Sequence, residues 1–187
     1  MRKINFGIVG LGRIGKIHFQ NIQIHCENAI ILAASNLNSN NQKWVKERGV
    51  EIIYDSFELM VSNPNIDAVI IASPTSFHAQ HIELACKAGK AIFCEKPIDL
   101  SLESVIKVDN KINLLKIPFM VGFNRRYDSN VLSLNENIQN GLIGTPQIIK
   151  ITSRDPEPPS MNYLKTSGGL FLDMAIHDFD MACYLNK

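Results

Sequence analysis

The sequence predicts an α/β fold: a doubly wound parallel sheet, followed by the beginning of a second, incomplete α+β domain. Three observations lead to it. Short apolar segments rich in β-branched residues alternate with helical patterns along the first two thirds of the chain. Most of these strands are continuously apolar, which is typical of a parallel sheet covered on both faces. The pattern then changes after Gly122, where alternation of strand and helix stops.

The elements of the first domain follow one another through short loops. We expect strands over residues 3–9, 30–34, 52–54, 68–71, 91–94 and 119–122. The helices expected between them cover 14–24, 42–48, 57–61, 78–88 and 102–115. Repeated βα units of this kind build a doubly wound Rossmann-type sheet, here over residues 1–122.

The second domain, residues 123–187, has a different pattern. A helix is expected over 129–139, and residues 147–153 alternate between apolar and polar side chains as a half-buried strand does. A proline-rich loop over 155–160 leads to Gly168 and Gly169, and a last helix is expected over 170–185.

Composition excludes several classes of function. The net charge is +1 with both signs mixed along the chain, which argues against binding of nucleic acid or of an anionic membrane surface. The longest apolar run, residues 68–72, is too short to span a bilayer. Met1 leads almost directly into a strand pattern, so we expect no signal peptide and a cytoplasmic location.

Cys26, Cys86, Cys94 and Cys183 are scattered along the chain. Without a Cys-x-x-Cys pair or a histidine cluster, we expect buried free thiols in a reducing compartment and no metal site.

A glycine-rich turn joins the first strand to the first helix. Its residues are Gly10, Gly12, Arg13, Ile14 and Gly15, in the spacing Gly-x-Gly-x-x-Gly. The first glycine permits a tight turn, the second lets a pyrophosphate approach the backbone, and the third lets the helix pack closely on the strand. The phosphates of a dinucleotide would then contact the free N–H groups at the helix N-terminus.

Asn36 stands at the end of the second strand, where an acidic residue usually binds the adenosine ribose. An amide can hydrogen-bond a ribose hydroxyl, but it does not repel a 2′-phosphate. No Arg or Lys lies between Ser35 and Gln42 to bind that phosphate. We therefore expect NAD as the cofactor, with NADP as the alternative.

Four ordered motifs resemble one family. They are the Glu95-Lys96-Pro97 sequence after a strand, residues 122–128, residues 153–156, and residues 168–180 with Asp173 and His177. Together they resemble the glucose–fructose oxidoreductase/inositol dehydrogenase (GFO/IDH/MocA) superfamily, and its inositol 2-dehydrogenase branch in particular. The resemblance runs from Ile4 to Leu185.

The resemblance implies roles for individual residues. In these enzymes the lysine of Glu-Lys-Pro lies beside the nicotinamide and the reacting carbinol, which implies that role for Lys96. Oxidation of a secondary alcohol needs a base, for which His177 is the candidate, while Lys96 would stabilise the developing alkoxide. Asp173 would orient the imidazole or bind a neighbouring hydroxyl. The resemblance also implies further contacts, to the cofactor from Ser73, Thr75, His78 and Glu95, and to a polyol from Arg126 and Asp155.

Spacing in the last helix supports two of these assignments independently. Asp173, His177 and Asp180 fall on one face of a helix that is otherwise almost entirely apolar. A buried stripe of carboxylate and imidazole costs free energy and usually has a use, although a structural histidine is the simpler alternative.

Relatives in the superfamily continue into a large, mostly antiparallel sheet through which they form homo-oligomers. Because the sequence ends at Lys187, we expect a C-terminally truncated form with an unpaired strand at 147–153. The leading hypothesis is an NAD-dependent inositol dehydrogenase. The alternatives are a dehydrogenase of another sugar or polyol, and an inactive dinucleotide-binding remnant.

Overall fold

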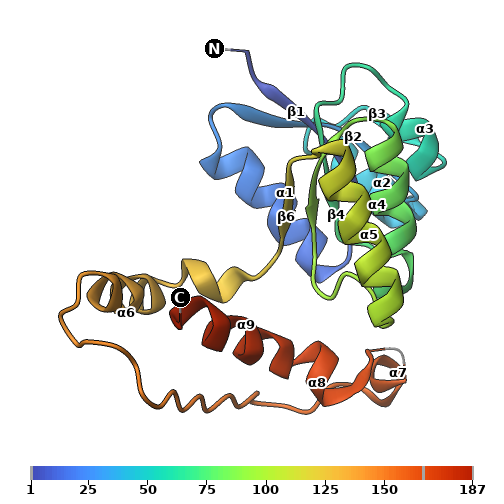
Figure 1. Ribbon diagram of the computed structural model, residues 1–187. Helices are drawn as coiled ribbons and strands as arrows, with labels where there is room; N and C mark the ends of the chain where they lie inside the picture. Colours follow the sequence, from blue (N-terminus) through green and yellow to red (C-terminus); the bar gives the residue numbers. More distant parts are fainter. Residues whose placement is uncertain (1, 166, 187) are drawn as a thin grey trace. The chain divides into compact units, whose positions relative to one another are not determined.

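Six parallel strands form one sheet in the order β3-β2-β1-β4-β5-β6 within the described part of the chain. The computed structural model describes residues 2–165 and 167–186 (Figure 1). The strands are β1 (Ile4–Val9), β2 (Ala29–Ser35), β3 (Ile52–Tyr54), β4 (Ala68–Ile71), β5 (Ala91–Cys94) and β6 (Phe119–Val121). The order reverses between β1 and β4, as in a doubly wound sheet, and the predicted fold class is confirmed.

Helices cover both faces of this sheet (Figure 1). On one face, α1 (Arg13–His25) and α2 (Ser39–Lys46) pack through Phe19 and Val45 against apolar side chains of β1, β2 and β4. On the other face lie α3 (Phe57–Val61), α4 (His78–Lys87) and α5 (Leu102–Leu115), which share a second apolar cluster with the same strands and with β5. A short 3-10 turn, η1 (Thr75–Phe77), precedes α4.

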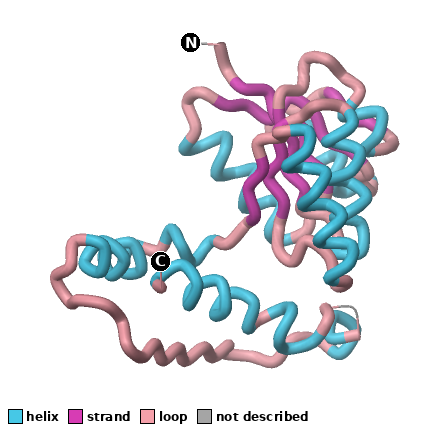
Figure 2. Tube along the Cα trace, in the orientation of Figure 1, coloured by secondary structure: helices cyan, strands magenta, loops and turns pink. Residues whose placement is uncertain are grey.

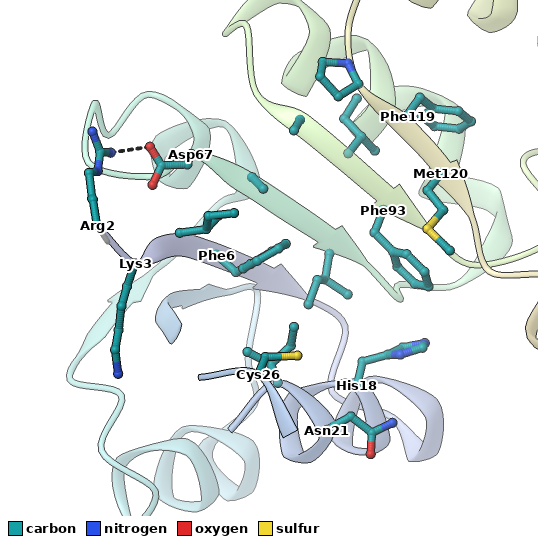
Figure 3. A pocket seen from close by; sticks show the side chains of 17 residues that line it. Arg2, Lys3, Phe6, His18, Asn21, Cys26, Asp67, Phe93, Phe119 and Met120 are labelled. Carbon is teal, nitrogen blue, oxygen red and sulfur yellow. Dashed lines mark hydrogen bonds and ion pairs between the residues drawn. The ribbon is translucent and has the colours of Figure 1, made fainter. Parts of the chain in front are cut away.

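The α1 side of the sheet is only partly covered. Beside α1, a pocket of about 760 Å³ lies along β1, β4, β5 and β6, with a mainly apolar lining. In Figure 3, Phe6, Phe93 and Met120 from the strands line this pocket together with His18 of α1 and Cys26 at the end of α1. An Arg2–Asp67 ion pair lies at the amino-terminal end of the strands. This pocket therefore lies on a face of the sheet, beside α1.

The chain divides at residue 122 into two compact units, Met1–Gly122 and Phe123–Lys187. The second contains η2 (Asn124–Tyr127), α6 (Ser129–Gln139), α7 (Met161–Leu164), α8 (Gly169–Asp173) and α9 (Ala175–Leu185). The predicted helix over 129–139 is present with those bounds.

The strand predicted over residues 147–153 is wrong. This segment has no regular secondary structure (Figure 2), and Ile148 is 90% exposed. Alternating side chains form a strand only when a neighbouring strand accepts the backbone hydrogen bonds. Every strand in the described part of this chain belongs to the parallel sheet of the first unit.

The single helix predicted over residues 170–185 is also wrong, because it is interrupted. α8 ends at Asp173 and α9 begins at Ala175, with Met174 in a turn between them. The amide of His177 donates to the carbonyl of Met174 at 3.2 Å, an i to i−3 bond that marks a tighter turn. No Gly or Pro marks this interruption in the sequence.

Burial of the cysteines is as expected for two residues and not for the others. Cys86 and Cys94 are buried, whereas Cys26 and Cys183 are exposed. Among the described residues no three His, Cys, Asp or Glu side chains come together as metal ligands would. No helix in residues 2–165 and 167–186 has the length and apolar character needed to cross a membrane.

Candidate cofactor and active site

The carboxyl ends of β1, β4, β5 and β6 lie level with one another. Three backbone bonds continue the ladder one residue beyond the strands: Ala72 N to Val9 O at 2.9 Å, Glu95 N to Ile71 O at 2.9 Å, and Gly122 N to Cys94 O at 2.8 Å. The loops that begin at Gly10, Ser73 and Lys96 therefore leave the sheet from one edge. Ligands of open α/β sheets bind at this edge, where the strand order reverses.

Two glycines of the first loop are required by close packing. Gly10 has a φ of +86°, and a Cβ there would lie 2.3 Å from the backbone of Ala72. A Cβ at Gly15 would lie 1.9 Å from the carbonyl oxygen of Gly10. The turn is thus pressed between β4 and its own helix, which fixes the direction of α1.

Gly12 differs from its neighbours because nothing packs against it. A Cβ at this position would meet no heavy atom within 4 Å. Gly12 is the N-cap of α1 and provides no side-chain cap, so Arg13, Ile14 and Gly15 form a first turn without a capping side chain. An open approach to uncapped helical N–H groups fits the pyrophosphate of a dinucleotide, which would contact them at the positive end of the helix dipole.

Asn36 follows β2 on the other side of this turn. Val9 and Ser35 are register partners, so Asn36 and Gly10 leave neighbouring strands at the same level. Asn36 has a φ of +55°, a left-handed conformation that asparagine adopts more readily than most residues. The backbone N–H of Asn36 donates to the carbonyl of Tyr54 at 3.2 Å. These positions suit the ribose contact predicted for Asn36.

Two histidines of α4 support the loop that carries Ser73 and Thr75. His78 is 1% exposed, and its ring nitrogens lie 2.7 Å from the carbonyl oxygens of Ser73 and Pro97. The Nδ1 atom of His81 lies 3.0 Å from the Ser73 hydroxyl. Burial, and to a smaller extent His78, lowers the pKa of the His81 imidazole from its ordinary 6.5 to about 4. The predicted cofactor contact of His78 stays a prediction, whereas its role between two loops is visible.

Glu95 and Lys96 follow β5 at the same edge. The Glu95 carboxylate accepts a hydrogen bond from the Lys96 amide at 3.2 Å, and its other oxygen lies 2.6 Å from Nε2 of His18. The side chain of Glu95 is 12% exposed and that of His18 is 21% exposed. Lys96 is half-buried.

Within the second unit, two arginines of η2 bind two aspartates of α9. Arg126 forms a two-pronged contact with Asp180, whose side chain is only 7% exposed, and Arg125 binds Asp178. The hydrogen bonds that Arg126 donates to the Asp180 carboxylate raise the pKa of its guanidinium above its ordinary value. Arg126, a predicted polyol ligand, thus has a partner within its own unit.

The remaining predicted residues also lie in the second unit. Asp173 ends α8 and accepts a hydrogen bond from the Tyr163 hydroxyl at 2.8 Å. His177 is half-buried in the first turn of α9, with its ring edge-on to Phe123 at 6.2 Å. Asp155 is exposed in the segment without regular secondary structure.

The predicted cofactor residues of the first unit therefore lie in or next to the loops at this edge of the sheet, and His78 among them is buried. Sequence reasoning assigned nothing to His18. Its position three residues after Gly15, one turn along α1, was the available signal, but its partner Glu95 lies 77 residues away.

Known families match both units of the chain. The family described as "Oxidoreductase family, NAD-binding Rossmann fold" (GFO/IDH/MocA) matches residues 4–123. The "GFO/IDH/MocA C-terminal domain" matches residues 131–187. The first match includes the whole parallel sheet and the glycine-rich turn.

Individual relatives agree with these matches. A Bacillus subtilis protein named "Uncharacterized oxidoreductase YrbE" is 45% identical over 98% of this chain and 54% of its own length. The myo-inositol 2-dehydrogenase of Thermotoga maritima is 42% identical over 97% of this chain and 54% of its own length.

Solved structures show the same similarity. The scyllo-inositol dehydrogenase of Lactobacillus casei, with bound NAD(H) and scyllo-inositol, superposes with a TM-score of 0.91 at 39% identity. That match covers 99% of this chain and 56% of the other. The chain thus spans about half the length of the curated relatives it matches.

Proposed function

Because the chain belongs to the GFO/IDH/MocA oxidoreductase family, whose first domain is an NAD-binding Rossmann fold, we propose that it serves an NAD-dependent inositol dehydrogenase reaction. Hydride would leave a ring carbinol of an inositol, giving a ketone. The family assignment confirms the resemblance predicted from the sequence, and the family's description confirms the predicted class of cofactor. The inositol substrate rests on relatives at 42% and 35% identity that are named as myo- and scyllo-inositol dehydrogenases.

One observation carries the proposal. Gly10 and Gly15 are needed for packing, whereas the backbone at Gly12 is open in front of an uncapped helix. A glycine that packing does not require, at the place where a pyrophosphate must approach, supports the binding of a dinucleotide.

Each proposed catalytic residue has one task. NAD supplies the carbon that accepts the hydride. In the proposed reaction, His177 would take the hydroxyl proton of the carbinol on its imidazole, and the Lys96 ammonium would donate a hydrogen bond to the carbinol oxygen as negative charge develops. Asp173, itself bound by the Tyr163 hydroxyl, would orient His177 or bind a second hydroxyl of the ring.

Substitution of two glycines tests the cofactor site. We expect Gly12→Ala to weaken NAD binding at least about tenfold, because the new methyl group blocks the pyrophosphate, with little change in melting temperature. Gly15→Ala should lower the melting temperature, because its Cβ would clash with the Gly10 carbonyl. Calorimetric titration and thermal unfolding of both variants are the measurements. If the Gly12→Ala variant bound NAD with wild-type affinity, the assignment of the pyrophosphate site to this turn would be wrong.

Titration with NADP tests the prediction for Asn36. We expect NAD to bind more tightly than NADP, because no cation lies between Ser35 and Gln42. An Asn36→Asp variant should widen this preference by repelling the 2′-phosphate. Tighter binding of NADP by the wild-type chain would contradict the assignment.

Turnover assays address the substrate. Reduction of NAD with myo-inositol or scyllo-inositol, and not with simple hexoses, is the expected result. Turnover of hexoses instead would favour the alternative sugar dehydrogenase. Binding of NAD without turnover of any polyol would support a dinucleotide-binding protein.

A further inference from the structure

We propose that His18 is a positioning residue that holds the Glu95–Lys96 turn against α1, acting through the Glu95 carboxylate; its relevance to catalysis rests on the proposed role of Lys96. His18 lies on the helix whose N-terminus forms the candidate pyrophosphate site. The pair therefore connects the element that would bind the cofactor to the loop that carries the proposed catalytic lysine.

The contacts of Glu95 define its position on several sides. Its Oε1 lies 2.6 Å from Nε2 of His18, and its Oε2 accepts from the Lys96 amide at 3.2 Å. A carboxylate only accepts, so Nε2 of His18 carries the donated proton. Both oxygens are thus used, one by α1 and one by the loop after β5.

Neighbouring residues leave the carboxylate little room to move. A Cβ at Gly122, the residue after β6, would lie 3.0 Å from Oε1 of Glu95. The His18 ring in turn lies edge-on to Phe93 of β5, with centroids 4.8 Å apart. Figure 3 shows the His18 and Phe93 rings close together between α1 and β5. Packing and hydrogen bonding thus determine the same arrangement.

This geometry makes the position of Lys96 depend on α1. If the His18 contact is removed, Glu95 loses its bond to the helix, and its carboxylate is no longer held in place to accept from the Lys96 amide. A displacement of α1, such as ligand binding at its first turn could produce, would reach Lys96 through two hydrogen bonds. Positioning of this kind affects the rate of a reaction more than the affinity for the cofactor.

Hydrogen exchange of the Lys96 amide reports on the link without any need for activity. In the full chain, His18→Phe keeps the ring next to Phe93 but removes the donor, and we expect the Lys96 amide to exchange about tenfold faster. His18→Gln, whose amide nitrogen can occupy the position of Nε2, should restore wild-type exchange. His25→Phe is the matched control, because His25 is exposed at the other end of the same helix.

Amides of Val69 to Ile71 in β4 serve as the internal reference. Their exchange should be unchanged in all three variants, which separates a local effect from loss of the fold. Unchanged exchange of Lys96 in His18→Phe, or a failure of His18→Gln to restore it, would overturn the proposal.

A double substitution decides the matter if His18→Phe also perturbs β4. Glu95→Gln alone should accelerate exchange of the Lys96 amide. Adding His18→Phe should accelerate it no further, because the two changes remove the same interaction. Additive effects of the two changes relative to the β4 amides would refute the link.

Addition of NAD separates this proposal from the proposed function. In the wild type, NAD should slow Lys96 exchange further, whereas in His18→Phe it should bind within about threefold of wild-type affinity and slow that amide by a smaller factor. Absence of NAD binding by calorimetry would count against the proposed function alone, since exchange without NAD still tests the His18–Glu95 link. Equal slowing of Lys96 exchange in both proteins would refute the coupling.

Discussion

His81 is buried on α4, 6% exposed, between the rings of Phe57 and Phe77 and beside the Ser73 hydroxyl. Burial is the main reason why its pKa falls to about 4. In the unfolded chain the imidazole has its ordinary pKa of 6.5. Between these two values the unfolded state binds more protons than the folded state. The stability contributed by neutral His81 is therefore complete above pH 6.5 and declines as the pH falls toward 4.

Replacement of His81 should reduce the acid sensitivity of the fold. From pH 7 to pH 4.5 we expect the wild type to lose about 2 kcal/mol more unfolding free energy than His81→Phe, which has no group to protonate. Urea denaturation at several pH values measures the difference. His25→Phe should follow the wild-type curve, and parallel curves for His81→Phe and the wild type would contradict the assignment.

The four thiols should fall into two classes of reactivity. Burial raises the pKa values of the Cys86 and Cys94 thiols, whereas Cys26 and Cys183 are exposed. Since the thiolate is the reactive form, iodoacetamide should modify Cys26 and Cys183 in the native chain and the other two only after unfolding. Mass spectrometry of the digested protein identifies the modified sites. Rapid native modification of Cys94 would show that β5 opens locally.

Residue roles could be predicted from the sequence where the determinant is local. The glycine-rich turn is an example, because its spacing alone specifies a strand-to-helix turn with three sterically distinct positions. The His18–Glu95 contact could not be predicted in this way, since it joins residues 77 positions apart. A histidine on an amphipathic helix has no pattern that distinguishes a buried hydrogen bond from solvent exposure.

At the scale of elements, prediction succeeded where a strand or helix has a complete environment within the chain. The bounds of β3, β4, β5, α3, α5 and α6 agree with the ranges expected from the sequence. The segment at 147–153 has strand-like alternation but no partner strand among the described residues, and it remains irregular. At Met174 the helix is interrupted without a Gly or Pro, so the sequence contains no strong helix breaker that would predict the break.

The η2–α9 contact should determine the stability of the last helix. Arg126→Leu leaves the Asp180 carboxylate, 7% exposed, without its guanidinium partner. We expect loss of about 1–2 kcal/mol, allowing for the partial exposure of the arginine, and faster hydrogen exchange throughout α9. Arg154→Leu, at an exposed arginine of the same unit, is the control. Equal protection of α9 in both variants would show that the ion pair contributes little.

At the scale of the whole molecule, the first unit contains all of the sheet and both of its apolar clusters. We therefore expect a chain of residues 1–122 to unfold cooperatively and to bind NAD within about threefold of the affinity of the full chain. Thermal unfolding and calorimetry test this. A disordered 1–122 chain would show that residues after Gly122 are needed for the sheet to form.

The contact between the Gly10 turn and Ala72 has a consequence for the order of events during synthesis. The residues of the turn leave the ribosome among the first, but the backbone that shapes it, at Ala72 directly after β4, follows about sixty residues later. Until β4 has emerged and paired with β1, the nascent chain has the glycine motif without the surface on which it closes. A nucleotide therefore cannot help the earliest segments to fold, and the first intermediate able to bind one must already contain residues through Ser73.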